Sequence, residues 1–187
     1  MRQILTAAAE LQELCRSKGW RFCVIGGIAV MRWGNPRTTV DVDVTLLTGF
    51  GDEGHFLDQL LTQFQPRYEN CREFALANRI ALLQTASGVR LDVALAGFPF
   101  EERAVKRATP YEFSPDVSLI TVSAEDLVVT KAFADRPRDW NDIEGVILCQ
   151  QGKLNWDVIV SELSFLCELK EAPEIVDRLL ALRDELQ

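Results

Sequence analysis

Hydrophobic residues recur along the chain with two different spacings, one typical of helices and one typical of strands. Apolar side chains three or four positions apart predict a helix over residues 2–17, which Gly19 is expected to end. Apolar and polar residues alternate over residues 39–46, which predicts a strand with one buried face. Prolines interrupt residues 97–118, and this segment is expected to be irregular. Shorter patterns predict further strands over residues 20–25, 80–85, 89–95 and 117–122, and further helices over residues 28–33, 55–64 and 71–77.

The last third of the chain has helical periodicity throughout. Ser123 and Asp126 form a capping box, with Asp in place of the usual Glu, which predicts a helix to about residue 134. Pro137 is expected to interrupt the pattern. Further helices are predicted over residues 139–150, over residues 156–169 and after Pro173.

This order of elements predicts the fold class α+β (α/β), in which a small mixed β-sheet flanked by helices is followed by a C-terminal helical cluster. Residues 1–122 are expected to form the core that carries the sheet, and residues 123–187 a helical region packed on it. With 187 residues, the chain is long enough to bury roughly 70% of its unfolded surface without a metal or a disulfide.

The composition, 48% hydrophobic and 26% charged, is that of an ordinary globular protein. No run approaches the ~18 apolar residues that a membrane span requires. Residues 1–15 are interpreted as an amphipathic helix and not as a signal peptide.

Acidic residues outnumber basic ones, 28 against 20, and the formal net charge is −8. A wide, sequence-independent nucleic-acid footprint depends on excess positive charge. The balance therefore counts against such a surface, although a local patch of Arg103, Lys106 and Arg107 stays open.

The five cysteines are scattered and lack CxxC spacing. Cys23 lies in an apolar run, and Cys15, Cys149 and Cys167 lie on the apolar stripes of predicted helices. Buried free thiols fit a reducing cytoplasm better than a disulfide scaffold. With one His and no paired cysteines, the chain is not expected to hold zinc.

Three carboxylates stand out because they lie inside predicted strands, where Asp is uncommon. Asp41 and Asp43 share one face of their strand, roughly 6.5–7 Å apart at the backbone. Asp92 lies on the polar face of another strand. If the two strands are neighbours, the three carboxylates converge, and their mutual repulsion favours a bound divalent cation. Ligands that are all oxygen atoms indicate Mg²⁺ or Mn²⁺.

Gly26 and Gly27 follow an apolar run and precede a helical turn. Backbone N–H groups at such a turn can approach a phosphate closely. A Gly-Gly pair is a weak signal by itself, and a plain turn is the alternative. Its position shortly before the strand of Asp41 and Asp43 favours the phosphate interpretation.

Three features together resemble the polymerase-beta-type nucleotidyltransferase superfamily. They are the Gly26-Gly27 turn, the segment Arg37-Thr38-Thr39-Val40-Asp41-Val42-Asp43, and Asp92. More closely, they are similar to the minimal nucleotidyltransferases that include the toxin half of type IV (abortive infection) toxin–antitoxin pairs.

Those toxins also have a later Lys…Asp-x-x-Asp segment, which is similar to Lys131, Arg136, Asp139 and Asp142 here. The segment departs from the toxin pattern at Arg138, which precedes Asp139 where the toxins have Lys. The resemblance covers about residues 20–148.

The resemblance implies a nucleotidyltransferase fold whose catalytic core is residues 1–122. It implies transfer of a nucleoside monophosphate from an NTP to an acceptor hydroxyl, with release of pyrophosphate. Asp41, Asp43 and Asp92 would be the catalytic residues and the ligands of two Mg²⁺ (or Mn²⁺) ions. The nucleotide-binding residues that it implies are Gly26, Gly27, Arg37, Lys131 and Asp142. A cognate antitoxin would be a partner, and no membrane is expected.

Simpler interpretations stay open for several of these residues. The Asp residues could line exposed or edge strands. Lys131 could pair with Asp135, one helical turn later. Asp139 and Asp142 could be the N-cap and N3 residues of the next helix, and Arg37 could pair with an acidic neighbour.

A second class of function also stays open, a degenerate module that binds a nucleotide or a partner without turnover. The presence of all three Asp residues favours an enzyme. The acceptor (RNA, a small molecule or a protein) and the identity of the NTP cannot be predicted from the sequence.

Overall fold

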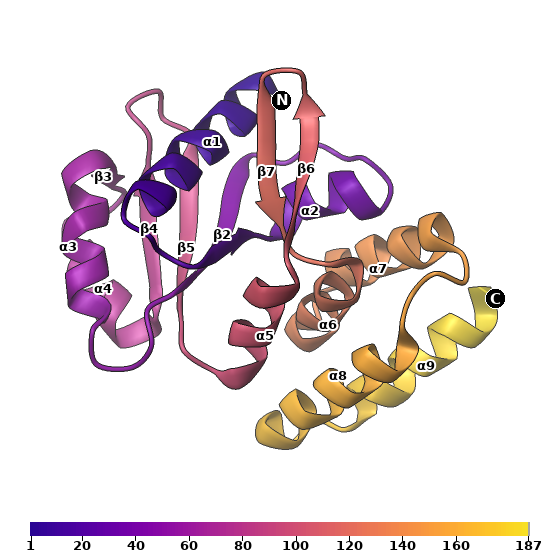
Figure 1. Ribbon diagram of the computed structural model, residues 1–187. Helices are drawn as coiled ribbons and strands as arrows, with labels where there is room; N and C mark the ends of the chain where they lie inside the picture. The colour runs from indigo at the N-terminus through magenta and orange to yellow at the C-terminus, as the bar shows by residue number, and fades with distance from the viewer. Residues whose placement is uncertain (187) are drawn as a thin grey trace. The chain divides into compact units, whose positions relative to one another are not determined.

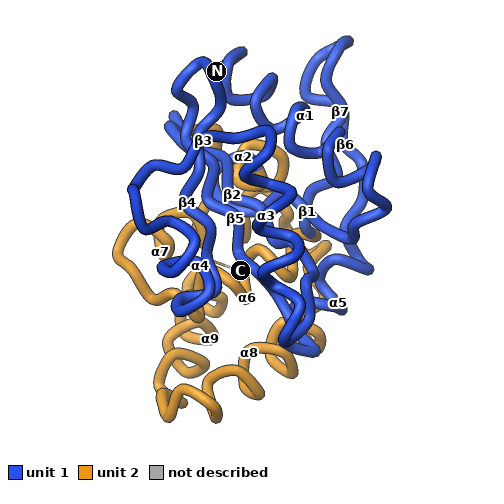
Figure 2. Tube along the Cα trace, turned by 90° about the vertical axis from the view of Figure 1, so that its left-hand side faces the viewer, with its two compact units in different colours: residues 1–28, 38–122 blue, residues 29–37, 123–187 orange. Residues whose placement is uncertain are grey.

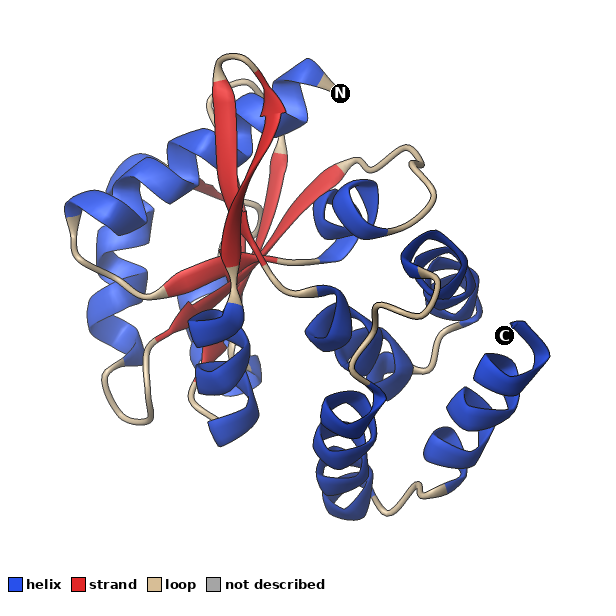
Figure 3. Cartoon of the chain, turned by 45° about the vertical axis from the view of Figure 1, so that its right-hand side comes forward, coloured by secondary structure: helices blue, strands red, loops and turns tan. Residues whose placement is uncertain are grey.

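The computed structural model describes residues 1–186, which form a mixed β-sheet with helices around it and a group of helices that follows (Figures 1 and 3). The strands are β1 (Phe22–Val24), β2 (Asp41–Leu47), β3 (Gln65–Pro66), β4 (Ile80–Gln84), β5 (Arg90–Ala96), β6 (Thr109–Ser114) and β7 (Val117–Thr121). The helices are α1 (Arg2–Ser17), α2 (Gly26–Trp33), α3 (Glu53–Gln63), α4 (Cys71–Asn78), α5 (Pro99–Arg107), α6 (Ala124–Ala134), α7 (Pro137–Gln150), α8 (Trp156–Lys170) and α9 (Glu174–Leu186).

The chain divides into two compact units, which Figure 2 shows in blue and orange. The first unit consists of residues 1–28 and 38–122, and the second of residues 29–37 and 123–187. The expected division had placed residues 29–37 with the sheet. The packing of the helical region on the core stays a prediction.

The sheet of the first unit has the strand order β3-β4-β5-β2-β1-β7-β6. β2 pairs with β5 in parallel, and β1 pairs with β7 in parallel, whereas the other neighbours are antiparallel. Alternate residues of the two central strands, such as Val42, Val44, Leu91 and Val93, are fully buried. The intervening residues therefore share the opposite face of the sheet.

Helix α1 packs against β7, β1 and β2. Its Gln12 side chain donates to the backbone oxygen of Ser118 at 2.7 Å and accepts from the backbone nitrogen of Ile120 at 2.8 Å. This amide therefore supplies hydrogen-bond partners to two backbone groups of β7.

The second unit is built around α6, which contacts α7, α8 and α9. Its residues are buried around most of the helix, among them Leu127, Val129 and Ala132. Ser123 is the N-cap residue of α6, as predicted, and its hydroxyl accepts from the backbone nitrogen of Asp126 at 3.1 Å. The same hydroxyl donates to Oδ2 of Asp126 at 2.8 Å.

Two proline-containing segments differ from the prediction. Residues 97–118 form α5 and β6, and α7 begins at Pro137. Pro99 and Pro137 each lie in the first turn of a helix, where the backbone N–H has no partner within the helix. The missing N–H of proline therefore costs no hydrogen bond there. Pro110 lies on β6, an edge strand of the sheet. Edge positions tolerate Pro because the ladder needs no donor there.

All five cysteines are free, and four of them are buried, but Cys149 is exposed. The prediction that Cys149 lies on a buried helical stripe is therefore wrong, because this residue lies on the exposed side of α7. Burial raises the pKa of Cys15 to about 12, so that thiol stays protonated. No helix within residues 1–186 is long and apolar enough to cross a membrane.

Candidate functional site

The three carboxylates predicted from the sequence lie on one face of two adjacent strands. β2 and β5 pair in parallel, and Asp43 lies directly opposite Asp92. Asp41 is the first residue of β2, two positions before Asp43 and therefore on the same face. All three are partly buried. Asp43 and Asp92 lie between buried neighbours of the opposite face, whereas Val40, which precedes Asp41, is exposed. The expected neighbourhood of the two strands is thus present.

The Gly26-Gly27 turn lies against this carboxylate face. Gly26 has a φ of +59°, and a Cβ added to it would lie 1.9 Å from Oδ2 of Asp43. A Cβ added to Gly27 would lie 2.4 Å from Oγ1 of Thr39. Only glycine fits at Gly26, because both its backbone conformation and its close approach to Asp43 exclude a side chain.

Thr39 is a site residue to which the sequence analysis gave no role. Its buried hydroxyl donates to Oδ1 of Asp41 at 3.1 Å. This bond fixes the orientation of the carboxylate just before β2 begins. The period of two offered a signal, because Thr39, Asp41 and Asp43 all fall on the same face.

Arg67 is a second residue that the sequence analysis did not single out. Its Nη2 donates to Oδ1 of Asp92 at 2.8 Å, and both side chains are largely buried, with exposed fractions of 16% and 25%. Burial raises the pKa of Asp92 and the charge of Asp41 raises it further, while Arg67 opposes both effects. Nothing in the local sequence of Arg67 indicates this contact, because β3 is only two residues long.

The chemistry of this face fits a hard divalent cation. Carboxylate oxygens are the ligands that Mg²⁺ prefers, and the glycine turn leaves backbone N–H groups beside them. As the side chains are placed, however, no group of three His, Cys, Asp or Glu residues within residues 1–186 gathers closely enough to hold a metal ion. One of the three carboxylates, Asp92, is instead bound by the guanidinium of Arg67.

The other predicted nucleotide-binding residues come together within the second unit. Arg37 binds Asp142 through two parallel bonds, Nε to Oδ1 at 2.6 Å and Nη2 to Oδ2 at 2.8 Å. The buried Nζ of Lys131 donates to Asp142 at 2.6 Å and to Asp139 at 2.9 Å. Arg136 also donates to Asp139, at 2.6 Å.

The bonds of this cluster contradict two of the simpler interpretations and confirm that Arg37 pairs with an acidic residue. Lys131 pairs with Asp139 and Asp142, not with Asp135, which contacts Arg178. Asp139 and Asp142 do not cap α7, because its N-cap residue is Arg136.

The electrostatic balance of the cluster acts on Asp142. Burial alone raises its pKa, but the bonds from Arg37 and Lys131 outweigh burial, so that the pKa of Asp142 lies below its ordinary value. The carboxylate therefore stays ionised and anchors both cations.

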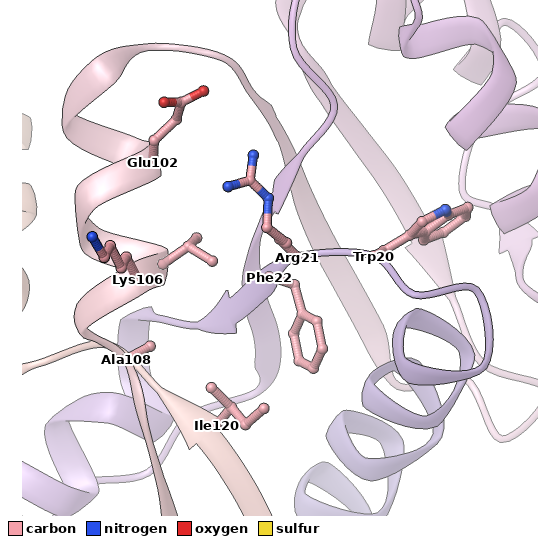
Figure 4. A pocket seen from close by; sticks show the side chains of 8 residues that line it. Trp20, Arg21, Phe22, Glu102, Lys106, Ala108 and Ile120 are labelled. Atoms are coloured by element: carbon pink, nitrogen blue, oxygen red, sulfur yellow. The ribbon is translucent and has the colours of Figure 1, made fainter.

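A cavity of about 280 Å³ lies elsewhere in the first unit, between the start of β1 and α5 (Figure 4). Phe22, the first residue of β1, and Arg21, just before it, line one side of this cavity. Glu102 and Lys106 of α5 line the other side. The candidate carboxylates do not line this cavity, since they lie beside the turn that follows the other end of β1.

Comparison with known proteins identifies the kind of fold. The model of a family described as "Nucleotidyltransferase of unknown function (DUF6036)" matches residues 2–168. No curated protein sequence matches the chain.

Two solved structures are similar to the chain along nearly its whole length. One is an antigenic nucleotidyltransferase-like protein from Paracoccidioides brasiliensis, with 16% identity, 97% of this chain and 94% of that chain covered, and a TM-score of 0.55. The other is the antibiotic-resistance factor ANT(2'')-Ia, with 14% identity, 91% of this chain and 94% of that chain covered, and a TM-score of 0.56. These similarities confirm the predicted fold class.

Proposed function

The chain belongs to the nucleotidyltransferase family DUF6036, and we propose that it transfers a nucleoside monophosphate from an NTP to an acceptor hydroxyl, with pyrophosphate as the leaving group. One observation carries this proposal. Asp43 and Asp92 lie directly opposite each other on parallel strands, and the Gly26-Gly27 turn is closed against Asp43. Catalysis of phosphoryl transfer rests mainly on positioning and electrostatics, so a small set of fixed groups suffices.

Asp41, Asp43 and Asp92 are proposed to hold Mg²⁺ or Mn²⁺. When bound, such ions polarise the phosphate oxygens and offset the charge that develops in transfer. Thr39 keeps the Asp41 carboxylate oriented. Asp92 also helps to activate the acceptor hydroxyl. The N–H groups of Gly26 and Gly27, at the start of α2, bind phosphate oxygens, because a helix N-terminus attracts anions.

Arg37, Lys131 and Asp142 are kept as proposed nucleotide-binding residues, but their contacts also support a structural role. Lys131 already lies between two carboxylates, and Arg37 is fully engaged by Asp142. Nucleotide affinity distinguishes the two roles. If Lys131→Met binds an NTP analogue as tightly as the wild type does, the residue acts on stability alone.

The proposed function is tested with α-labelled NTPs, Mg²⁺ and a panel of acceptors. The wild type should transfer label and release pyrophosphate, and EDTA should stop both. Asp41→Asn should lower the rate by at least about 100-fold, the scale on which one electrostatic group acts in a transition state. Asp58→Asn is the matched control, because Asp58 is an exposed carboxylate of the same unit. Transfer that survives Asp41→Asn or the removal of divalent cations would contradict the proposal.

The same assay separates the enzyme from a binding module. A degenerate module would bind an NTP analogue in a calorimeter, with dependence on Gly26, and would release no pyrophosphate with any acceptor.

The acceptor panel should contain RNA, hydroxylated small molecules and proteins. ANT(2'')-Ia is called an antibiotic-resistance factor, so aminoglycosides belong on the panel.

The resemblance of the sequence to type IV toxins gives a narrower proposal, that transfer by this chain arrests growth unless an antitoxin is present. Controlled expression of the wild type should then slow growth, and Asp41→Asn should not. Normal growth with active wild-type enzyme would contradict the toxin proposal and leave the transferase proposal intact.

A further inference from the structure

Strands β3, β4, β5 and β2 are neighbours in the sheet, in that order (Figure 1). Asp92 and the residues around it lie opposite one another across these strands. The backbone nitrogen of Arg67, just after β3, donates to the backbone oxygen of Leu82 on β4 at 3.1 Å. Leu82 lies opposite Asp92 on β5, and Asp92 lies opposite Asp43 on β2. Residues directly opposite each other share a face. The Arg67 side chain therefore starts on the carboxylate face and reaches across β4 to Asp92.

The Arg67–Asp92 pair is incompletely bonded. One nitrogen of the guanidinium donates to one oxygen of Asp92, at 2.8 Å. The Nε of Arg67 is buried and has no hydrogen-bond partner among residues 1–186. A buried donor without an acceptor costs free energy, so this arrangement is not the best that an arginine and a carboxylate can make.

The pair formed by Arg37 and Asp142 shows the difference. There both oxygens of the carboxylate are bound by two nitrogens of the guanidinium, and Lys131 adds a third bond. Two-point pairs of this kind are the stronger ones. Because Arg67 makes a single bond to Asp92, replacing this arginine by another ligand of Asp92 costs less free energy than breaking the Arg37–Asp142 pair would.

We infer that Arg67 and a divalent cation compete for Asp92: the guanidinium neutralises this carboxylate beside Asp41 and Asp43, and a bound cation displaces it. The inference rests on the proposed function, because it takes Asp92 as a cation ligand. It also accounts for the absence, within residues 1–186, of a three-carboxylate group gathered as a metal site. Arg67 is then a positioning residue that sets the cation affinity of the site.

The test measures Mn²⁺ affinity of the whole chain by calorimetry, with and without a non-hydrolysable NTP analogue. Arg67→Gln should bind Mn²⁺ about tenfold more tightly than the wild type, the scale on which one neighbouring charge changes the affinity of a carboxylate for a proton. Arg72→Gln is the matched control, since Arg72 is an exposed arginine of the same unit, paired with Asp58. Its affinity should equal that of the wild type. A purely structural role would weaken binding in Arg67→Gln, so a gain in affinity is specific to competition.

A second measurement uses the wild-type chain, in case Arg67→Gln does not fold. The Nε–H of Arg67 can be followed by NMR, because burial of this atom is expected to slow its exchange with water. Mg²⁺ should shift this signal and speed rotation of the guanidinium, and the signal of Arg72 should stay unchanged.

Each outcome decides the inference. Tighter binding in Arg67→Gln, or binding only in that variant, supports competition. Equal or weaker binding, or an Arg67 signal that ignores Mg²⁺, overturns it while leaving the proposed transferase intact. If no protein binds Mn²⁺ under either condition, the inference and the cation part of the proposed function both fail.

Discussion

At the scale of single residues, the candidate site depends on two close contacts made by its carboxylates. The close approach of Gly26 to Asp43 and the bond from Thr39 to Asp41 hold two carboxylates in place before any ligand binds. Such preorganisation removes part of the cost of ordering the site during the reaction.

Gly26→Ala tests this arrangement. The substitution forces a side chain into a φ of +59° and against Asp43, so we expect a loss of about 1–3 kcal/mol in the free energy of unfolding and a displaced carboxylate. Gly19→Ala is the control, because Gly19 has a φ of +67° but no atom within 4 Å of an added Cβ. It should lose about 1 kcal/mol and keep its Mn²⁺ affinity. Urea unfolding and calorimetry measure both effects, and intact Mn²⁺ binding in Gly26→Ala would refute the close-packing argument.

At the scale of helices and strands, regular hydrophobic patterns predicted the elements correctly, whereas prolines led to breaks being predicted where helices begin. The alternation in β2 placed Asp41 and Asp43 on one face, and that in β5 placed Asp92 on the polar face of its strand. The parallel pairing of the two strands, which brings the three together, is seen only in the structure. The sequence predicts breaks at Pro99 and Pro137, but each lies in the first turn of a helix. Arg67 could not be predicted, because its contact with Asp92 depends on how β3, β4 and β5 pair, which the residues around Arg67 do not indicate.

The buried cluster on α6 and α7 gives a prediction for stability. Asp142→Asn removes the carboxylate that Arg37 binds at two points and that Lys131 shares with Asp139, so we expect a loss of about 3 kcal/mol in the free energy of unfolding. Glu144→Gln, at an exposed position of the same helix, should change it by less than about 0.5 kcal/mol. Equal stabilities for these two variants in urea unfolding would contradict the anchoring role of Asp142.

The same cluster predicts a dependence on pH. The folded-state pKa of Asp142 lies below its ordinary value of 3.8. Its contribution to stability is therefore fully present above that ordinary value and is lost as the pH falls through the lower, folded-state pKa. Unfolding measured from pH 7 to pH 2 should show the wild type and Asp142→Asn converging only below about pH 4. A difference that vanishes already near pH 6 would show that another group is responsible.

At the scale of the whole molecule, the formal charge of −8 constrains the acceptor. Arg103, Lys106 and Arg107 lie on α5, whose first turn carries Glu101 and Glu102. Acidic residues thus precede the basic ones on the same helix, which limits a basic patch. The bound cations of the proposed site would reverse the local field for a triphosphate, but not for an extended RNA.

A labelled single-stranded RNA should therefore bind weakly in near-physiological salt, without saturation below about 100 μM. Fluorescence polarisation across a salt series measures this. Low-micromolar binding that weakens steeply with salt would show a basic surface that the net charge conceals.

The central claim is that Asp41, Asp43 and Asp92 form one cation site beside the Gly26-Gly27 turn. Anomalous scattering from crystals grown with Mn²⁺ and a non-hydrolysable NTP analogue tests it most directly. We predict Mn²⁺ peaks about 2.1 Å from oxygens of all three carboxylates, with the triphosphate on the glycine turn and Arg67 no longer bound to Asp92. Crystals that contain the analogue but have no Mn²⁺ peak at these carboxylates would contradict the account.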